Sequence, residues 1–281
     1  MNKVNRIGRV WKMKYLNMII FLFVITHLAK GQKIITNGSI QLGKDTINVP
    51  AAGTIRWTGA DFEGWTGSRW LSLTLGDKVM DVDGNVYYPI KIGNQIWLDR
   101  NLKTSKYNDG TIIPLSSNAG EWNTAAVNLL PSYCWYNDDQ LTNGISYGAL
   151  YNFYALDSTS NGGKNVCPTG WIVPSKTDIE RLRENLGGQN IAGGKLKEVG
   201  FSFWLSPNYG ANNISGFSAV GAGRRGPSGT FAGLKTNDYI RTRTLENYPN
   251  STYGLLSASD EMFVVSEWNN GIGMSIRCIR E

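Results

Sequence analysis

The stretch Cys167-Pro168-Thr169-Gly170-Trp171-Ile172-Val173-Pro174-Ser175, followed by Lys176-Thr177-Asp178-Ile179-Glu180-Arg181-Leu182, decides how the rest of this chain is organised. It predicts a buried turn that leads into a helix, because Ser175 is a natural N-cap and Asp178 follows three residues later. Ile179, Leu182 and Leu186 have the spacing of one apolar helix face, and Gly187-Gly188 is expected to end the helix. We expect this stretch to be tied to the C-terminal strand through Cys278.

The chain has three cysteines, Cys134, Cys167 and Cys278. We favour a disulfide between Cys167 and Cys278, because both flank segments that should meet in the core and a secreted chain permits disulfides. Three free thiols are the alternative. With that bridge formed, Cys134 is expected to be a buried thiol that packs as a small hydrophobic side chain, with no histidine or nearby cation to lower its pKa.

Residues 1–31 have the pattern of a secretory signal peptide. Lys and Arg come early, an apolar run extends from Leu16 to Ile25, and Ala29-Lys30-Gly31 supplies small residues for cleavage. A membrane-anchoring helix is the alternative, but this run of 10 residues is short of the roughly 20 that span a bilayer. We therefore expect a secreted protein, extracellular or on the outer cell surface, with no transmembrane anchor after cleavage.

The leader also accounts for the basic character of the chain, whose pI is about 9.1. It holds six of the 28 lysines and arginines and no acidic residue, which leaves 22 basic residues to balance the 22 acidic ones. The charge is therefore no argument for nucleic-acid binding, and none is expected. The one histidine, His27, also lies in the leader, so a mature chain without it has no His base, no Ser–His or Cys–His pair and no His-ligated zinc.

Residues 32–78 predict a β-rich linker, stalk or oligomerisation segment. Two similar strands are expected at 54–58 and 69–74, with a glycine-rich turn series between them. This piece resembles short segments at stalk or trimer junctions of phage tail fibres and bacterial surface proteins. Its three tryptophans cannot all be buried within so short a segment, so a homotrimer through residues 54–74 is one expectation. A hairpin docked on the following domain is the other.

Further along, Asp81-Val82-Asp83-Gly84-Asn85 has oxygen side chains at alternate positions, as a calcium loop does. The glycine is fourth instead of sixth and the twelfth residue is Ile92, so we interpret the Asp-Gly pair as a hairpin turn and expect no metal. A second hairpin is expected with strands 86–92 and 95–98 joined by Gly93-Asn94. The aromatic residues between 133 and 156 are expected to be mostly core, a sugar-stacking platform being the alternative.

Several motifs follow one another in a fixed order along the chain. They are Asp83-Gly84-Asn85-Val86-Tyr87, Ile92-Gly93-Asn94-Gln95-Ile96-Trp97-Leu98, Tyr133-Cys134-Trp135-Tyr136, Tyr147-Gly148-Ala149-Leu150-Tyr151, Cys167-Pro168-Thr169-Gly170-Trp171, Gly193-Gly194-Lys195-Leu196-Lys197-Glu198 and Ser275-Ile276-Arg277-Cys278. Together they resemble the Fibrobacter major paralogous domain (FISUMP) family. The resemblance places such a domain at residues 79–281. It implies an α+β, C-type-lectin-like fold, with a small twisted antiparallel sheet, one or two helices and long loops. Members occur in secreted and surface proteins, chiefly of Bacteroidetes and Fibrobacter lineages.

Departures from that family and its fold group limit what the resemblance implies. The family usually has His where this chain has Ile172. A formylglycine-generating enzyme of the same fold group needs its own cysteine pair in the active site, and two of the three cysteines here are expected to form a structural bridge. Glu267-Trp268-Asn269-Asn270 only partly matches the triplet with which C-type lectins bind calcium. We therefore expect no cofactor.

A ligand surface is expected on the C-terminal loops, which lectin-like folds vary on a rigid scaffold. Aromatic rings, planar arginines and amides suit adaptable binding, although core packing of the rings is the alternative. The candidates are Tyr239, Arg241, Arg243, Tyr248, Tyr253, Trp268, Asn269 and Asn270.

We expect a non-catalytic binding or adhesion protein that recognises an extracellular protein or glycan. The alternatives are the structural head of a trimeric fibre and, less favoured, a lectin-fold enzyme. Carboxylates such as Asp99, Asp109 and Glu198 are available, but nothing in the sequence brings two of them together to form an acid/base pair.

Overall fold

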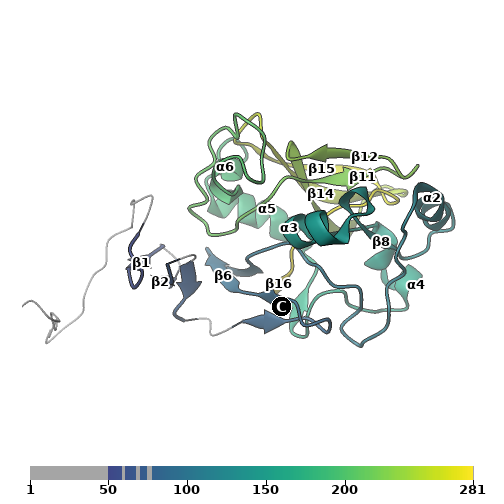
Figure 1. The fold of residues 1–281 in the computed structure, drawn as a ribbon, viewed down its shortest axis with the longest axis horizontal. Coiled ribbons are helices and arrows are strands. Elements are labelled where there is room, and N and C mark those ends of the chain that lie inside the picture. The colour runs from purple at the N-terminus through teal and green to yellow at the C-terminus, as the bar shows by residue number, and fades with distance from the viewer. Residues whose placement is uncertain (1–49, 59–60, 68–69, 75–77, 281) are drawn as a thin grey trace, which may run out of the picture. The chain divides into compact units, whose positions relative to one another are not determined.

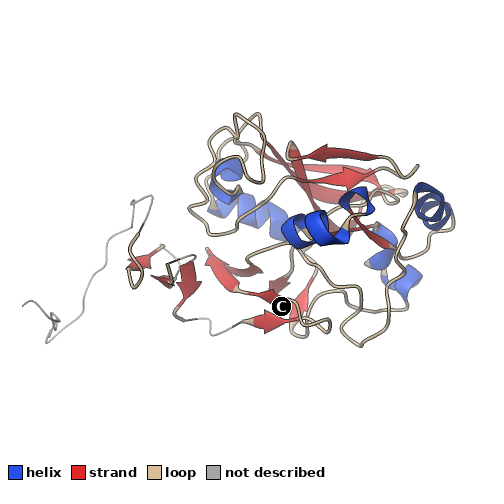
Figure 2. Ribbon diagram, viewed as in Figure 1, coloured by secondary structure: helices blue, strands red, loops and turns tan. Residues whose placement is uncertain are grey.

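Short strands and helices joined by long loops make up the chain in the computed structural model, which describes residues 50–58, 61–67, 70–74 and 78–280 (Figure 1). These residues belong to one compact unit, residues 43–281. The predicted leader, residues 1–31, lies outside the described residues. Helices and strands occur in separate segments and the strand pairing is mostly antiparallel, so the fold is α+β, as expected (Figure 2).

The helix predicted after Ser175 is confirmed as α5, Lys176–Asn185. The Ser175 side chain accepts a hydrogen bond from the backbone N–H of Asp178, and the Asp178 carboxylate accepts one from the backbone N–H of Ser175. This is the reciprocal capping box that satisfies two free donors at a helix start. Leu186 caps the other end, and Gly187 follows with φ of 98°, a conformation that glycine adopts without strain.

One sheet joins the two ends of the domain. It has the order β10 (Trp171–Ile172), β16 (Ile279–Arg280), β7 (Gln95–Leu98) and β6 (Pro89–Ile92). The predicted turn at Gly93-Asn94 connects β6 to β7, and β16 lies between β7 and β10. The C-terminal strand therefore pairs with the segment that leads into α5.

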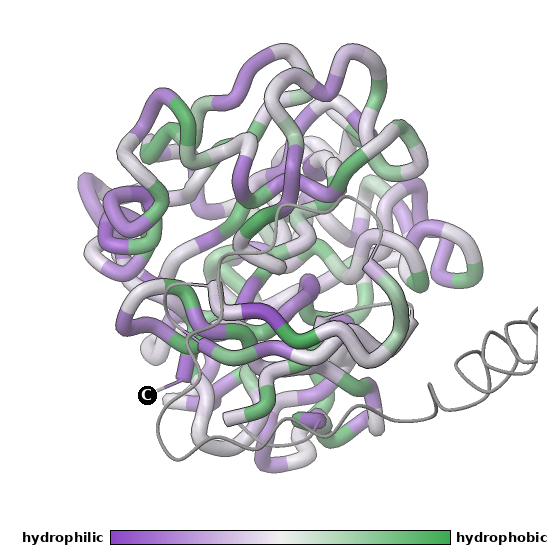
Figure 3. Tube along the Cα trace, turned by 90° about the vertical axis from the view of Figure 1, so that its left-hand side faces the viewer, coloured by the Kyte–Doolittle hydropathy of each residue, from purple (hydrophilic) through white to green (hydrophobic). Residues whose placement is uncertain are grey.

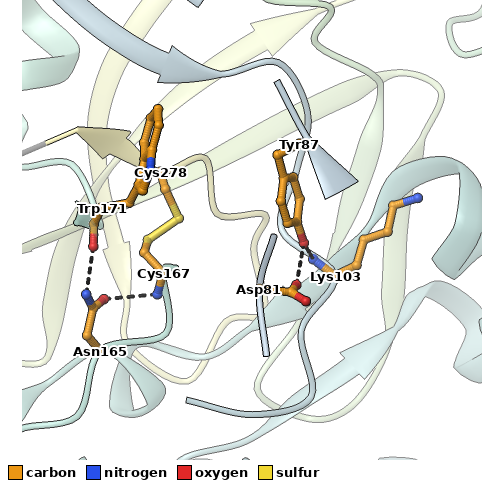
Figure 4. The surroundings of a disulfide bond; sticks show 7 residues. All are labelled: Asp81, Tyr87, Lys103, Asn165, Cys167, Trp171 and Cys278. Atoms are coloured by element: carbon orange, nitrogen blue, oxygen red, sulfur yellow. Dashed lines mark hydrogen bonds between the residues drawn. A yellow bond between two sulfur atoms is a disulfide. The ribbon is translucent and has the colours of Figure 1, made fainter. Parts of the chain in front are cut away.

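The predicted disulfide between Cys167 and Cys278 is confirmed and fully buried (Figure 4). Asn165 holds the segment on one side of it, because its amide donates to the carbonyl of Trp171 at 2.7 Å and accepts from the N–H of Cys167 at 2.9 Å. Nearby, the Tyr87 hydroxyl donates to the Asp81 carboxylate and accepts from the backbone N–H of Lys103. The bridge thus lies within a packed and hydrogen-bonded core.

A five-stranded sheet forms the other main layer, in the order β12 (Phe231–Leu234), β11 (Ala222–Arg225), β13 (Asn237–Leu245), β14 (Asn250–Ser257) and β15 (Phe263–Asn269). Helix α5 packs on β13, β14 and β15. The apolar side chains between the helix and the sheet form a second core, separate from the one around the disulfide.

The N-terminal piece differs from the expectation. Its described residues form three antiparallel strands, β1 (Ile55–Trp57), β2 (Phe62–Trp65) and β3 (Trp70–Ser72), and not two strands around a turn series. Glu63 pairs with Arg56 on one side and Ser72 on the other, so the expected turn region supplies the middle strand. Gly64, which lies within the expected turn series, instead pairs with Ile55 and Leu71 in the sheet.

The remaining elements are short. The turn predicted at Asp83-Gly84 is confirmed between β4 and β5. The described chain also has more helical segments than the one or two expected. The short strands are β4 (Val79–Met80), β5 (Val86–Tyr87), β8 (Tyr133–Trp135) and β9 (Ala149–Tyr151). The further helical segments are α2 (Ala119–Val127), α3 (Ile145–Tyr147), α4 (Ser158–Asn161), α6 (Ala192–Leu196), η1 (Tyr136–Asp138), η2 (Gln140–Gly144) and η3 (Phe153–Ala155).

Hydrophilic and hydrophobic residues alternate over short distances along the described chain (Figure 3). None of its described helices has the length and apolar composition that crossing a bilayer requires.

Candidate functional site

The structure brings three of the predicted ligand-binding side chains together on one face of the five-stranded sheet. Tyr239 comes from β13, Tyr253 from β14 and Trp268 from β15. Their ring centroids lie 5.7 Å apart for the two tyrosines, and Trp268 lies 5.9 and 6.0 Å from them. The guanidinium of Arg224 covers the tryptophan at 4.5 Å. The sequence had suggested a shared surface but not this stack.

Much of this group is interior, however. Tyr239, Arg241, Tyr253 and Asn270 are all buried. The Arg241 guanidinium donates to the Ser251 hydroxyl at 2.5 Å and to a backbone carbonyl, and burial lowers its pKa to about 9. Tyr239 and Arg241 lie on strand β13 and not on a loop as we expected. Successive side chains of the strand point to opposite faces of the sheet, and side chains on both faces are buried.

The other four candidates are more accessible. Arg243 and Tyr248 are exposed, and Trp268 and Asn269 are half-buried. Tyr248 lies in the connection between β13 and β14 and is 63% exposed. A direct role of the eight residues in binding remains a prediction.

A larger hollow lies elsewhere, and sequence reasoning missed it. It is a cleft of about 910 Å³, within the roughly 300–1,000 Å³ of small-ligand sites. One wall, the sheet wall, comes from β1, β2 and β3, and the other, the loop wall, comes from loops between residues 90 and 220 and from Arg277. The main side chains are Arg56, Glu63, Trp65 and Trp70 on the sheet wall, and Asp99, Arg100, Asn101, Lys103, Tyr147, Glu198, Phe203, Asn212, Asn213, Ser218 and Arg277 on the loop wall.

The sheet wall presents charge and aromatic rings on the same face. The register pairs Arg56 with Glu63 and Trp65 with Trp70, and alternation along β2 places Glu63 and Trp65 on one side. Arg56 donates from Nε and Nη2 to one oxygen of Glu63, at 2.8 and 2.7 Å. Its guanidinium lies 4.1 Å from the centroid of the Trp70 ring, and the two tryptophan rings are 5.4 Å apart. Burial raises the pKa of Glu63, although Arg56 opposes the rise.

On the loop wall, Asp99 and Arg100 form a second Arg–carboxylate pair. Arg100 donates from Nε at 3.1 Å and from Nη2 at 2.8 Å to the Asp99 carboxylate, which also accepts the backbone N–H of Tyr88. Lys103 donates to the backbone carbonyl of Ile145. Its pKa is lowered, first by burial and then by the neighbouring charge of Arg100.

A buried lysine holds the part of the loop wall that carries Asn212 and Asn213. Lys197 is fully buried, and its ammonium donates to the backbone carbonyls of Tyr209, Ser257 and Asp260 at 2.9, 2.6 and 2.6 Å. Three carbonyl acceptors satisfy the three donors of an ammonium group. This contact ties the loop that carries Asn212 and Asn213 to the end of the five-stranded sheet.

Each carboxylate of the cleft in the described residues already has a partner. Glu63 pairs with Arg56, Asp99 pairs with Arg100, and Glu198 accepts from the Asn213 amide at 3.0 Å. The structure thus brings Asp99 and Glu198 to one cleft, whereas Asp109 does not line it. All three carboxylates are therefore engaged by side chains of the protein itself.

The structure also locates two other features considered in the sequence analysis, the Cys134 thiol and the loop that begins at Asp81. Cys134 is a buried free thiol, as expected, but a cation, Arg225, does lie near it. Burial nevertheless raises the pKa of the thiol to about 12, so it is not the thiolate that a nucleophile requires. Within the residues described, no three His, Cys, Asp or Glu side chains gather to hold a metal ion. Asp81 accepts from Asn85 and Tyr87, which is the hydrogen bonding of a turn.

Comparison with known proteins gives one match. The family model described as the Fibrobacter succinogenes major domain matches residues 90–280. No curated protein and no solved structure matches the chain.

Proposed function

Since the chain belongs to the Fibrobacter succinogenes major domain family, we propose that it is a secreted or cell-surface binding protein without catalytic activity. Its ligand is an extracellular protein or glycan. The signal-peptide pattern of residues 1–31 supports export, and a disulfide is compatible with an oxidising compartment. A C-type-lectin-like arrangement is part of the proposal, supported by the disulfide-linked ends and the long loops of the domain.

The observation that carries the proposal is the chemistry of the cleft. It combines a volume of about 910 Å³ with half-buried aromatic rings and polar side chains, two of whose arginines are paired with carboxylates. Such a surface offers hydrogen bonds and flat apolar contacts to a ligand, while its carboxylates are engaged by Arg56, Arg100 and Asn213. The exposed β13–β14 hairpin, with Arg243 and Tyr248, provides a second contact region for a large ligand.

A binding screen tests this function. Purified protein, residues 32–281, is applied to a printed glycan array and to a displayed peptide library, and hits are measured by calorimetry. We expect saturable binding without turnover of the hit. Phe203→Ala tests the cleft and Trp268→Ala tests the C-terminal sheet. Binding that neither change weakens would contradict a binding role for both the cleft and the C-terminal sheet. Turnover of a bound compound would contradict the proposal that the protein has no catalytic activity.

One observation favours a second function, the head of a trimeric fibre. The side of the β1–β3 sheet opposite Arg56 and Glu63 carries Ile55, Phe62 and Leu73, which are 52%, 39% and 55% exposed. An exposed apolar sheet face is typical of an interaction surface. Light scattering on residues 32–281 and 79–281 tests this: a trimer that only the longer protein forms, and that Phe62→Asp dissociates, is the expected result. Monomers in both cases would contradict it.

A further inference from the structure

The cations that line the cleft each have an acceptor within the protein. Arg56 pairs with Glu63 and Arg100 with Asp99. The ammonium of Lys103 bonds a backbone carbonyl. Arg277 is fully buried and donates to the side chain of Asn101 and to two backbone carbonyls. Among the described lining residues, Lys103 and the buried Arg277 are not paired with a carboxylate. An anionic ligand could therefore reach only Lys103 unless it displaced a carboxylate from its arginine.

An entirely apolar ligand fits no better. It would remove water from the exposed Arg100–Asp99 pair and from the Glu198–Asn213 hydrogen bond without supplying a polar partner. The surface instead calls for a ligand that is uncharged but rich in hydrogen-bonding groups. Hydroxyl groups suit this surface, because each of them both donates and accepts hydrogen bonds.

Both arginines retain hydrogen-bonding capacity toward such hydroxyls. A guanidinium has five N–H donors, and the contacts to the paired carboxylates use only Nε and Nη2 of Arg56 and of Arg100. The accessible pair is Arg100–Asp99, whose side chains are 43% and 13% exposed, whereas the Glu63 side chain is only 2% exposed. Two neighbouring hydroxyls of a ligand can therefore accept from the guanidinium and donate to the carboxylate of the Arg100–Asp99 pair.

The aromatic residues add flat apolar contact to this pattern. Trp65 and Trp70 on the sheet wall and Phe203 on the loop wall are half-buried, so part of each ring is accessible. Phe203 is braced edge-on by Tyr147, with ring centroids 5.9 Å apart. The C–H face of a sugar ring packs on an aromatic face while its hydroxyls point sideways to polar groups. We infer that the cleft binds a neutral oligosaccharide, which names the ligand class of the proposed function and rests on it.

A peptide is the competing ligand class. Peptides that lie along a protein are commonly read by the free edge of a strand through backbone hydrogen bonds. The cleft is instead lined by the side chains of a sheet face and of loops. This composition favours a ligand that is recognised through hydroxyl groups and ring faces.

The experiment uses purified protein, residues 32–281, on an array of neutral and uronic-acid-containing oligosaccharides, with EDTA present throughout. The strongest neutral hit is then titrated by calorimetry at salt concentrations from about 50 to about 500 mM. Binding is expected to be unaffected by salt, since the ligand carries no charge. Trp65→Ala and Phe203→Ala are expected to weaken it about tenfold or more.

Phe201→Ala is the matched control, because Phe201 is two residues away, 60% exposed and outside the cleft lining. It should bind like the unmodified protein. Thermal unfolding of each variant shows that it is folded; should Phe203→Ala fail to fold, Asn212→Ala replaces it, since Asn212 is exposed on the loop wall.

The outcomes separate this inference from the function beneath it. Binding of acidic oligosaccharides alone, or affinity that falls steeply with salt, would overturn the neutral-ligand assignment and leave a binding cleft. A library peptide whose binding depends on Phe203, with no oligosaccharide bound, would do the same. Absence of any ligand that depends on the cleft would overturn both.

Discussion

The buried carboxylate of Asp238 should control how the stability of this protein changes with pH. Asp238 lies on β13 and is completely buried. Burial raises its pKa to about 7, although Arg277 and Ser275 partly offset the loss of hydration. In the unfolded chain the pKa returns to the ordinary value for aspartate, 3.8. The folded state therefore binds the proton more tightly than the unfolded state does.

The direction and size of the effect follow from this difference. The contribution of Asp238 to stability is fully present below the unfolded pKa and is lost as the pH rises through the folded pKa, between about 4 and about 7. A difference of about three pKa units corresponds to about 4 kcal/mol. Asp238→Asn keeps the shape of the protonated acid but cannot ionise. The variant should therefore match the unmodified protein near pH 4 and exceed its free energy of unfolding by up to about 4 kcal/mol above pH 7.

Urea unfolding with the disulfide intact measures this directly across the pH window. Glu63 also has a raised pKa, so the informative quantity is the difference between variant and unmodified protein at each pH. Glu184→Gln is the control, because the side chain of Glu184 is 64% exposed. Parallel stability curves for Asp238→Asn and the unmodified protein would refute the reasoning, since they would mean that the buried group carries no net proton-linked cost.

Three further predictions concern stability, and a fourth concerns the free thiol. Replacing Cys167 and Cys278 together by alanine should cost about 4–5 kcal/mol in urea unfolding, because the bridge closes a loop with a sequence separation of 111; a loss under about 1 kcal/mol would contradict this. A thiol titration of the denatured, unreduced protein should find the Cys134 thiol alone. Ser175→Ala should cost about 1 kcal/mol by removing the N-cap of α5, and no change in urea midpoint would count against the capping box. Lys197→Met should cost about 3 kcal/mol, because three buried carbonyls lose their donor, and hydrogen exchange should rise around Tyr209; an unchanged exchange pattern would show that the ammonium does not hold the loop.

Local chemistry made several parts of the fold predictable. The N-cap at Ser175 and the turn at Gly93-Asn94 depend on neighbours in the chain, so a short stretch contains all the necessary information. The pairing of Cys167 with Cys278 was reached from the expectation that their flanking segments meet in the core, and the structure confirms it.

The predicted binding surface shows where sequence reasoning stops. In the sequence, Tyr239 and Arg241 look as polar and adaptable as Arg243 does. In the structure, strand β13 has buried side chains on both of its faces, and Tyr239 and Arg241 are among them while Arg243 is exposed. Only the packing of Ile272 and Met274 against the stack decides that the tyrosines are interior. The nearby cation that Cys134 appeared to lack is Arg225, which is 91 residues away in sequence and reaches the thiol only through the fold.

The sequence by itself determined the cap at Ser175 and the turns at Asp83-Gly84 and Gly93-Asn94, because each is a property of neighbouring residues. The tertiary structure alone decided the cleft. Its walls bring Glu63 and Trp65 to the same cleft as Asp99 and Phe203. The ion pair between Arg56 and Glu63 forms because both side chains lie on the same face of the β1–β3 sheet. No local pattern records such distances, because they arise only when separate segments pack against each other.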